Sequence, residues 1–192
     1  MKKIILASAS PRRKQLLELA EVSFEIKVSQ VDETFPAGIS PAQAAMHIAE
    51  NKAVAVKINL DNGNEQTIIA ADTVVVLNEE ILGKPVDRED AIHILGKLSG
   101  KVHKVITGVC ILSASGKTVF SQETQVEFYH LSKKQIEYYV DQYKPYDKAG
   151  AYAIQEWIGA IGIKSITGDF YNVMGLPVSR VVDELRMVNG KE

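Results

Sequence analysis

Cysteine is almost absent from this sequence of 192 residues: Cys110 is the only one, and it stands inside an apolar run. A single thiol forms no intramolecular disulfide and no cysteine-based metal cluster, so a disulfide-stapled domain is excluded. We expect Cys110 to be a buried structural thiol rather than a nucleophile. The four histidines, His47, His93, His103 and His130, lack the close spacing of a zinc site, and none is assigned a ligand role.

Long hydrophobic runs are missing as well. After Met1-Lys2-Lys3, the apolar stretch Ile4-Ile5-Leu6-Ala7 is only about four residues long, too short for a signal peptide or a membrane span. It predicts a first β-strand instead. Together with the low cysteine content, it predicts a cytoplasmic protein without a membrane partner.

Net charge is nearly absent too, because 22 basic residues face 24 acidic ones and leave a balance of -2. No overall field attracts nucleic acid, so any anion site must be local. The chain also lacks fixed-period repeats, low-complexity tracts and long linkers. Its length fits one domain or one two-lobed domain, and we predict a single domain over residues 1–192.

Three common motifs are not found: the Walker lysine motif, the dinucleotide-binding G-x-G-x-x-G and the nucleophile elbow G-x-S-x-G. P-loop, dinucleotide-binding and serine-hydrolase interpretations therefore have no support in the sequence.

Strand-like and helix-like segments alternate along the chain, which predicts an α/β or mixed fold. Serine followed by proline marks two helix starts, and a β-branched run predicts a central strand buried on both faces. The expected helices cover residues 10–20, 40–58, 87–98, 132–143 and 177–188. The expected strands cover 2–8, 24–28, 68–77, 102–112, 118–128 and a short piece near 159–164, with a turn at 61–64.

A strand end and a helix start meet at Ser8-Ala9-Ser10-Pro11-Arg12-Arg13. Arg12 and Arg13 fall in the first turn of the helix, where the free N–H groups and the helix dipole are already positive. An anion held by backbone N–H groups, serine hydroxyls and guanidinium groups would remove this conflict, with Ser8 and Arg13 as phosphate ligands. An ordinary capped helix with its arginines in solvent explains the motif equally well.

Two charged residues stand in apolar surroundings. Lys52 shares a helical stripe with Ile48 and Val56, and a lysine there usually extends to the edge of the apolar surface. We favour that interpretation over an ammonium facing a phosphate in a cleft. Asp72 lies in the predicted buried strand, where a carboxylate is costly unless it is paired, hydrogen-bonded or metal-bound. It is a functional candidate, and an ion pair with Lys84 or an arginine is the competing interpretation.

Two further residues give weaker signals. Glu33 follows a strand-like segment and could supply a second oxygen ligand to a hard metal, although such acidic residues are more often simply solvated. Gln155 ends a stretch rich in glycine and alanine, and its amide offers both a donor and an acceptor. That suits hydrogen bonding to the edge of a nucleobase, but equally a tight packed turn. Asp169 is expected to be a cap or turn residue.

Taken in order, these segments resemble the Maf (septum-formation) family of nucleoside triphosphate pyrophosphatases. The match covers essentially the whole chain, through residues 6–13, 33, 51–53, 71–73, 83–85, 107–109, 147–155 and 168–177. The resemblance implies a two-lobed α/β fold with a long twisted mixed sheet, flanking helices and a central cleft. It further implies a relation to the inosine triphosphate pyrophosphatases.

The resemblance also implies metal-dependent attack by water at the α-phosphorus. Asp72 aligns with the family's proton acceptor, with metal contact as an added role, and Glu33 aligns with a metal-linked carboxylate. The positions aligned with phosphate contacts are Ser8, Arg13, Lys52 and Lys84, and those associated with substrate choice are Arg12, Thr73 and Gln155. The segment 147–155 looks like the branch that acts on dTTP and UTP, because the 7-methyl-GTP branch typically has a glutamate at the position of Gln155.

The residues agree with this chemistry. A triphosphate carries about four negative charges, which Arg13, Lys52, Lys84 and a metal ion would neutralise. Oxygen ligands favour Mg²⁺ or Mn²⁺. We predict hydrolysis of dTTP and UTP, or of modified pyrimidine nucleotides, to the monophosphate and pyrophosphate.

Two alternatives stay open: a nucleotide-binding regulator of cell division or septation with little turnover, and a house-cleaning pyrophosphatase for altered purine nucleotides. Asp72, which would repel a bound anion, favours an enzyme over a regulator. The expected partner is a nucleoside triphosphate, with no nucleic acid, and a homodimer is left open.

Overall fold

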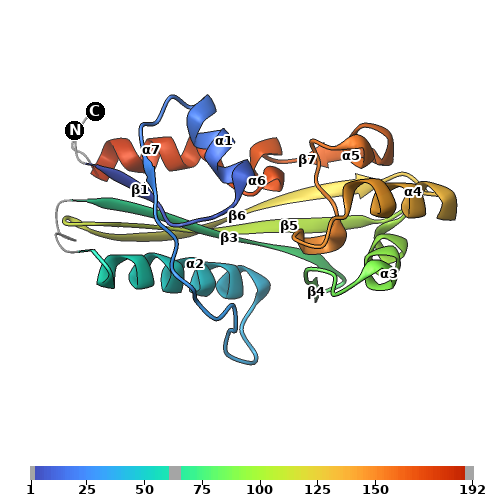
Figure 1. Ribbon diagram of the computed structural model, residues 1–192, viewed down its shortest axis with the longest axis horizontal. Coiled ribbons are helices and arrows are strands. Elements are labelled where there is room, and N and C mark those ends of the chain that lie inside the picture. Colours follow the sequence, from blue (N-terminus) through green and yellow to red (C-terminus); the bar gives the residue numbers. More distant parts are fainter. Residues whose placement is uncertain (1–2, 61–65, 189–192) are drawn as a thin grey trace. The chain divides into compact units, whose positions relative to one another are not determined.

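The computed structural model describes residues 3–60 and 66–188 (Figure 1). Its strands are β1 (Ile4–Leu6), β2 (Glu25–Ile26), β3 (Thr67–Leu77), β4 (Glu80–Leu82), β5 (Val102–Ser113), β6 (Gly116–Phe128) and β7 (Ile163–Thr167). Its helices are α1 (Pro11–Leu19), α2 (Pro41–Ile58), α3 (Arg88–Leu98), α4 (Lys133–Tyr143), α5 (Trp157–Gly162), α6 (Phe170–Met174) and α7 (Val178–Val188), with a 3₁₀ turn, η1 (Ala149–Ala151).

The strands form one mixed sheet in the order β2-β1-β3-β5-β6-β7, with β4 paired to β3. β1 runs parallel to both β2 and β3, whereas β4 pairs antiparallel with β3 and β7 antiparallel with β6. The predicted α/β class with a mixed sheet flanked by helices is therefore confirmed. No helix among the described residues has the length and apolarity that a membrane span requires.

The chain divides into two compact units, in keeping with two predicted lobes: residues 1–72, 107–122 and 175–192, and residues 73–106 and 123–174. In the first unit, α2 covers one face of the strands, and α1 and α7 cover the other (Figure 1). The core under α2 contains Ile5, Ala53, Ile68 and Cys110. Burial raises the pKa of the Cys110 thiol to about 12, so Cys110 is the expected structural thiol and a poor nucleophile.

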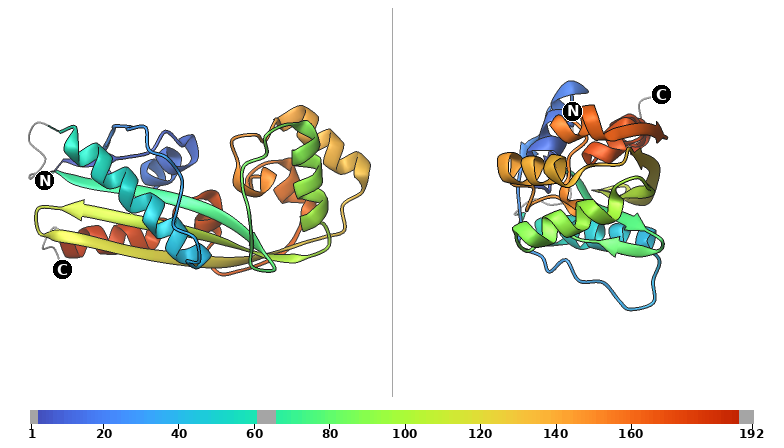
Figure 2. Two further views of the ribbon diagram at one scale, coloured as in Figure 1. Left: turned by 90° about the horizontal axis from the view of Figure 1, so that it is seen from below. Right: turned by 90° about the vertical axis from the view of Figure 1, so that its right-hand side faces the viewer.

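The second unit has its own core. Strand residues such as Val75 and Phe128 pack there against Leu95 from α3, Tyr139 from α4 and Ile158 from α5. α3 and α4 lie side by side (Figure 2). Because this core is independent of the one under α2, each unit has a hydrophobic interior of its own.

Three of the predicted helix starts are confirmed by side-chain caps, whereas Ser10 stands at the N-cap of α1 without a side-chain cap hydrogen bond. Ser40 and Ser132 each form a capping box, with Gln43 and Gln135 respectively, and the Asp87 side chain accepts from the backbone N–H of Asp90. The helices begin and end within about one residue of the expected bounds. The expected strands at 102–112 and 118–128 are confirmed as the neighbouring strands β5 and β6. The buried central strand is confirmed too, since nearly every residue of β3 is buried.

Other expectations about elements were wrong. Residues 159–162, predicted as part of a strand, belong to α5, because Gly159 N–H and Ala160 N–H both donate to the Glu156 carbonyl and start a helix; the strand β7 begins only at Ile163. The expected strand at 24–28 is reduced to two residues, and the short elements β4 and α6 were not among the predicted ones. Asp169 does cap α6, by accepting from Tyr171 N–H at 2.7 Å. The predicted turn at 61–64 lies outside the described residues.

Candidate active site

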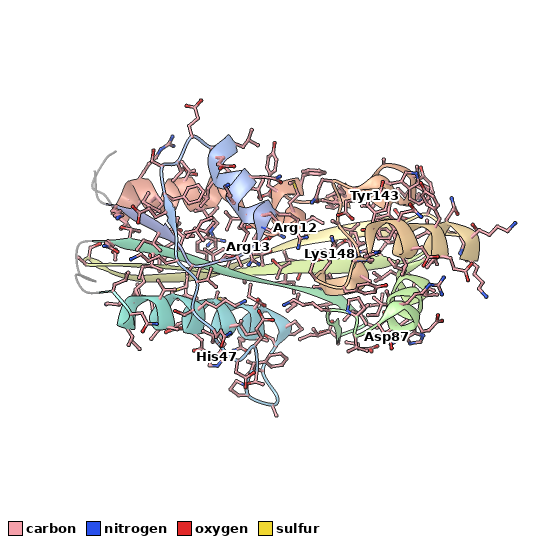
Figure 3. The ribbon with its side chains drawn as sticks, in the orientation of Figure 1. Arg12, Arg13, His47, Asp87, Tyr143 and Lys148 are labelled. Atoms are coloured by element: carbon pink, nitrogen blue, oxygen red, sulfur yellow. The ribbon has the colours of Figure 1, made fainter. Side chains whose placement is uncertain are left out.

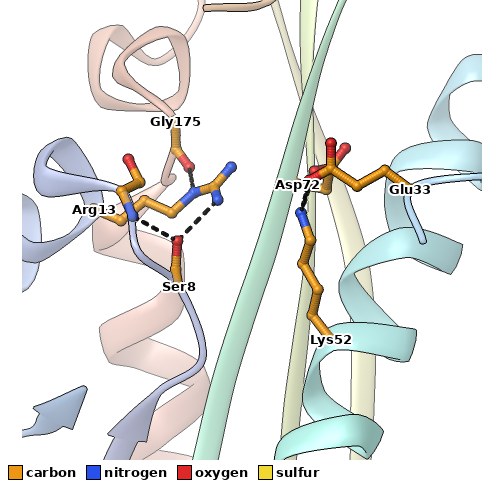
Figure 4. Close-up of polar contacts among 7 residues, drawn as sticks. Ser8, Arg13, Glu33, Lys52, Asp72 and Gly175 are labelled. Carbon is orange, nitrogen blue, oxygen red and sulfur yellow. Dashed lines mark hydrogen bonds and ion pairs between the residues drawn. The ribbon is translucent and has the colours of Figure 1, made fainter. Parts of the chain in front are cut away.

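Ser8 and Arg13 form the first group of the site. Ser8 follows β1 and is buried, and its hydroxyl oxygen accepts from the Arg13 Nη1 at 3.2 Å and from the backbone N–H of Ser10 at 3.2 Å. The Arg13 Nε donates to the carbonyl of Gly175 at 2.8 Å (Figure 4). Arg13 is thus a buried guanidinium held by the fold, and the alternative in which it extends into solvent is wrong.

Burial dominates the electrostatics of Arg13. It lowers the pKa of the guanidinium, the neighbouring Arg12 lowers it further, and the carboxylates of Asp72 and Glu33 raise it. Arginine nevertheless stays charged, so the unit keeps a buried cation beside a half-buried one at the start of α1. Two cations at a helix N-terminus strongly attract an anion, such as a phosphate, to this place.

Lys52, Asp72 and Glu33 form the second group. The Lys52 ammonium nitrogen lies 2.7 Å from Asp72 Oδ1 and 2.7 Å from Glu33 Oε1 (Figure 4). The Asp72 side chain is only 12% exposed and that of Lys52 17%, whereas that of Glu33 is 44% exposed. The Lys52 ammonium therefore sits between two carboxylates, an arrangement that neither interpretation of the helical stripe specified. Lys52 is also a partner of Asp72 that the sequence did not indicate.

This second group fits a divalent cation. Two carboxylate oxygens already converge on a single positive charge at the Lys52 nitrogen, which shows that Glu33 and Asp72 can share one cation. The described residues contain no group of three or more His, Cys, Asp or Glu side chains arranged to hold a metal. Mg²⁺ is commonly bound by one or two carboxylates and completed by substrate phosphates and water, so two protein oxygens match an ion that arrives with its substrate.

Three more residues of interest belong to the second unit. Thr73 is half-buried in β3, whereas Lys84 and Gln155 are exposed. The backbone N–H of Gly150 donates to the carbonyl of Gly83 at 3.1 Å, and this bond joins the segment that ends in Gln155 to the loop that carries Lys84.

Gly150 also explains why this segment is rich in glycine. Its φ of +68° favours glycine, and an added Cβ would lie 2.8 Å from a methyl of Val75. The backbone at Gly150 is thus tightly packed against the Val75 side chain.

Several contacts were not foreseen. The carbonyl of Gly175 has no sequence signal, because any residue supplies a carbonyl. Lys148 is buried, with its ammonium 2.8 Å from Asp147 Oδ1 and 3.5 Å from Glu156 Oε1. The sequence did contain a signal for this pairing. Lys148 stands in a run of small residues, so its stem has little apolar surface to cover and its ammonium needs an acidic partner. Glu156 follows eight positions later.

The family model described as Maf-like protein matches residues 3–188. The chain is 48% identical over 185 residues to the dTTP/UTP pyrophosphatase of Parabacteroides distasonis, covering 96% of this chain and 95% of that protein. It is 47% identical to the protein of the same name from Bacillus cereus, covering 97% and 95% respectively. Among solved structures, the Ham1 protein of Staphylococcus aureus aligns with a TM-score of 0.48 and 15% identity, over 66% of this chain and 72% of that one.

Proposed function

The chain belongs to the family of Maf-like proteins, and from that premise and the geometry of the site we propose that it hydrolyses dTTP and UTP to the nucleoside monophosphate and pyrophosphate. The observation that carries the proposal is the arrangement around Asp72. A nearly buried carboxylate lies 2.7 Å from the Lys52 ammonium and close enough to Arg13 to influence its pKa. A carboxylate that can accept a proton, together with cations that can neutralise phosphate charge, suits the attack of water on a phosphate ester or anhydride.

The cations bind the substrate's phosphates in this proposal. The Arg13 guanidinium is fixed by Ser8 and the Gly175 carbonyl, so it needs no reorganisation when a phosphate arrives. Lys52 and Lys84 supply further positive charge. Ser8 offers a hydroxyl at the same place as Arg13.

Asp72 accepts the proton from the attacking water. A carboxylate serves as a general base when it lies within hydrogen-bond reach of that water, and its burial in β3 fixes its direction. A divalent metal, when bound, supplies neutralisation of phosphate charge and acidification of the water. Glu33 and Asp72 are the residues that would hold it, with Mg²⁺ or Mn²⁺ as the matching ions.

A regulator that binds nucleotide without turnover is less well supported. Asp72 and Glu33 would repel a triphosphate, and simple binding gains nothing from them. Catalysis does gain from them, as a proton acceptor and as oxygen ligands. The proposal includes a cytoplasmic location and requires neither nucleic acid nor membrane; a homodimer stays a prediction.

Product analysis tests the proposal directly. Purified protein is incubated with UTP and Mg²⁺, and the products are separated by ion-exchange chromatography at early times. We expect UMP and pyrophosphate in equal amounts, with dTTP and UTP preferred over CTP and GTP and little turnover after chelation of the metal. Early UDP and free phosphate would show attack at the γ-phosphorus and overturn the proposal.

A further inference from the structure

Gln155 is an exposed side chain on a turn whose other residues are held in place. Ala153 and Ile154 before it are buried, and the backbone N–H of Glu156 after it donates to the Ala153 carbonyl at 3.1 Å. The turn is thereby closed around Gln155, whose side chain is exposed.

Helix α5 packs directly against the backbone of this turn. At Gly159 an added Cβ would lie 1.7 Å from the Ile154 carbonyl oxygen, so the first turn of the helix rests directly on the residue before Gln155. Only glycine permits this approach. The backbone on the N-terminal side of Gln155 therefore has little freedom.

A buried tyrosine ties the two ends of the turn together. The Tyr139 hydroxyl, from α4, accepts from the backbone N–H of Ala153 at 3.2 Å and donates to the carboxylate Oε2 of Glu156. Tyr139 itself is fully buried. Because one hydroxyl bonds to the residues on both sides of Ile154 and Gln155, it fixes the width of the turn.

The other carboxylate oxygen of Glu156 also has a partner. The ammonium of Lys148 lies 3.5 Å from Glu156 Oε1, and the Lys148 side chain is only 10% exposed (Lys148 is labelled in Figure 3). Burying a lysine is costly unless carboxylates compensate it, and here Asp147 and Glu156 do so. The carboxylate of Glu156 is thus held from two sides, by Tyr139 and by Lys148.

We infer that Glu156, held by Tyr139 and Lys148, is a positioning residue that fixes the direction of the Gln155 amide and thereby the choice of nucleobase. The inference rests on the proposed function. Uracil and thymine present an acceptor at O4 beside a donor at N3, which one amide can match, whereas cytosine presents the reverse pattern. An amide on a fixed turn pays little ordering entropy and cannot readily rotate to suit the wrong base.

Glu156→Gln is the central test. The amide still offers an acceptor to the Tyr139 hydroxyl but no longer pairs with the Lys148 ammonium. We expect the ratio of kcat/KM for UTP over CTP to fall about 5- to 10-fold, chiefly through KM for UTP, with kcat for UTP changed less than about 3-fold. Glu127→Gln is the matched control, since Glu127 pairs with Lys164 and Ser165 in the same unit and does not touch the turn. It should leave the ratio unchanged.

Tyr139→Phe is the second variant, and it serves equally if Glu156→Gln does not fold. It keeps the buried ring and removes both hydrogen bonds to the turn, so the same fall in the UTP/CTP ratio is expected. Circular dichroism melts establish that each variant is folded before its kinetics are interpreted.

A double variant separates positioning from general damage. Gln155→Ala alone should abolish the preference for UTP over CTP, and Glu156→Gln added to it should change the ratio no further, because Glu156 acts through Gln155. Equal losses on UTP and CTP in the single Glu156→Gln variant would show a merely structural role and overturn the inference. An unchanged ratio in Gln155→Ala would overturn it as well, while pyrophosphate release by the wild type would leave the proposed function standing. If the wild type releases no pyrophosphate, the proposed function fails, and the inference with it.

Discussion

Asp72 is the residue whose removal bears most directly on the mechanism. Asp72→Asn keeps the size of the side chain but removes its charge and its ability to accept a proton. Loss of a general base lowers rates by about 10²–10⁴-fold, and loss of a metal contact adds to this. Nucleotide affinity should be kept or improved, because a negative charge has gone. The measurement pairs kcat, from pyrophosphate release, with calorimetric binding of UTP in the presence of Ca²⁺.

The control for Asp72→Asn is Asp141→Asn. Asp141 is a paired carboxylate on the surface of α4, where it binds Arg88, and its change should leave kcat as it is. A kcat for Asp72→Asn within a few-fold of the wild type would mean that another group accepts the proton.

Lys52 yields a second prediction at the residue scale. Its ammonium occupies the point where Glu33 and Asp72 converge, 2.7 Å from each, so in the substrate-free protein it competes with a divalent ion for those oxygens. Lys52→Gln removes the competing charge. We expect Mn²⁺ binding without nucleotide to tighten by several-fold, measured by electron paramagnetic resonance titration, while UTP binds more weakly.

Lys117→Gln provides the comparison for Lys52→Gln. Lys117 pairs with Glu50 on the surface of the same unit, and its change should not alter Mn²⁺ binding. Unchanged or weaker Mn²⁺ binding in Lys52→Gln would show that the ammonium does not compete with the metal.

The sequence indicates residues of this kind only through local conflicts. Arg13 in the first turn of a helix and Asp72 in a buried strand are both visible as charges in unfavourable places. The surroundings of Lys52 could not be foreseen, because its partners stand 19 and 20 residues away in a loop and in a strand. A stripe of Ile48, Lys52 and Val56 predicts where the stem of the lysine lies but not what its ammonium meets.

At the scale of elements, α2 and β5 touch through their backbones. A Cβ added at Gly108 in β5 would lie 2.3 Å from the carbonyl carbon of Ala45 in α2, so only glycine fits. Gly108→Ala should therefore push α2 away from the sheet and destabilise the protein by about 2–4 kcal/mol. Because α2 carries Lys52, activity should fall together with stability. Urea unfolding followed by circular dichroism measures the first effect and pyrophosphate release the second.

Gly96 is the matched glycine for this prediction. It lies inside α3 with open space around its Cβ position, so Gly96→Ala should stabilise the protein by about 0.5–1 kcal/mol through helix propensity. Equal effects of the two substitutions would contradict the close approach of α2 and β5.

Capped helices were predictable and short glycine-rich elements were not. The capping boxes at Ser40 and Ser132 mark helix starts in the sequence itself, because the residues that close them are only three positions apart. In contrast, α5 and the start of β7 share one apolar run, Trp157 to Ile163, with two glycines. A run this short does not distinguish a helix from a strand by periodicity, and tertiary packing against the Ile154 carbonyl decides in favour of a helix.

For the whole molecule, the sequence predicts the class of fold but not its pairings. Alternating helices and strands predict α/β, yet the order of strands depends on contacts between distant segments. The bond from Arg13 to the Gly175 carbonyl joins residues 162 positions apart, and no local pattern reports it. The two-lobed arrangement around a long mixed sheet was therefore expected only from the family resemblance.

Stability of the whole molecule should depend on pH through His103. This histidine is buried in the core of the second unit, its Nε2 lies 2.7 Å from the Tyr152 hydroxyl, and its Nδ1 has no hydrogen-bond partner among the described residues. Burial lowers the pKa of His103 to about 4, against about 6.5 for an unperturbed histidine. Below pH 6.5 the unfolded chain takes up a proton that the folded protein does not, so the free energy of unfolding decreases as pH falls toward 4. Between pH 8 and pH 5 this contribution amounts to about 2 kcal/mol.

His103→Gln tests this pH dependence. The glutamine amide can still bond to the Tyr152 hydroxyl and does not titrate, so the variant should lose less stability than the wild type on acidification, even if it is less stable at pH 8. Urea unfolding at pH 8, 6.5 and 5 gives the difference between the two proteins at each pH, which removes the contribution of all other titrating groups. His93→Gln, on the exposed side of α3, should follow the wild-type curve. If wild type and His103→Gln lose equal stability between pH 8 and pH 5, then His103 is protonated in the folded protein and the core of the second unit admits a charge.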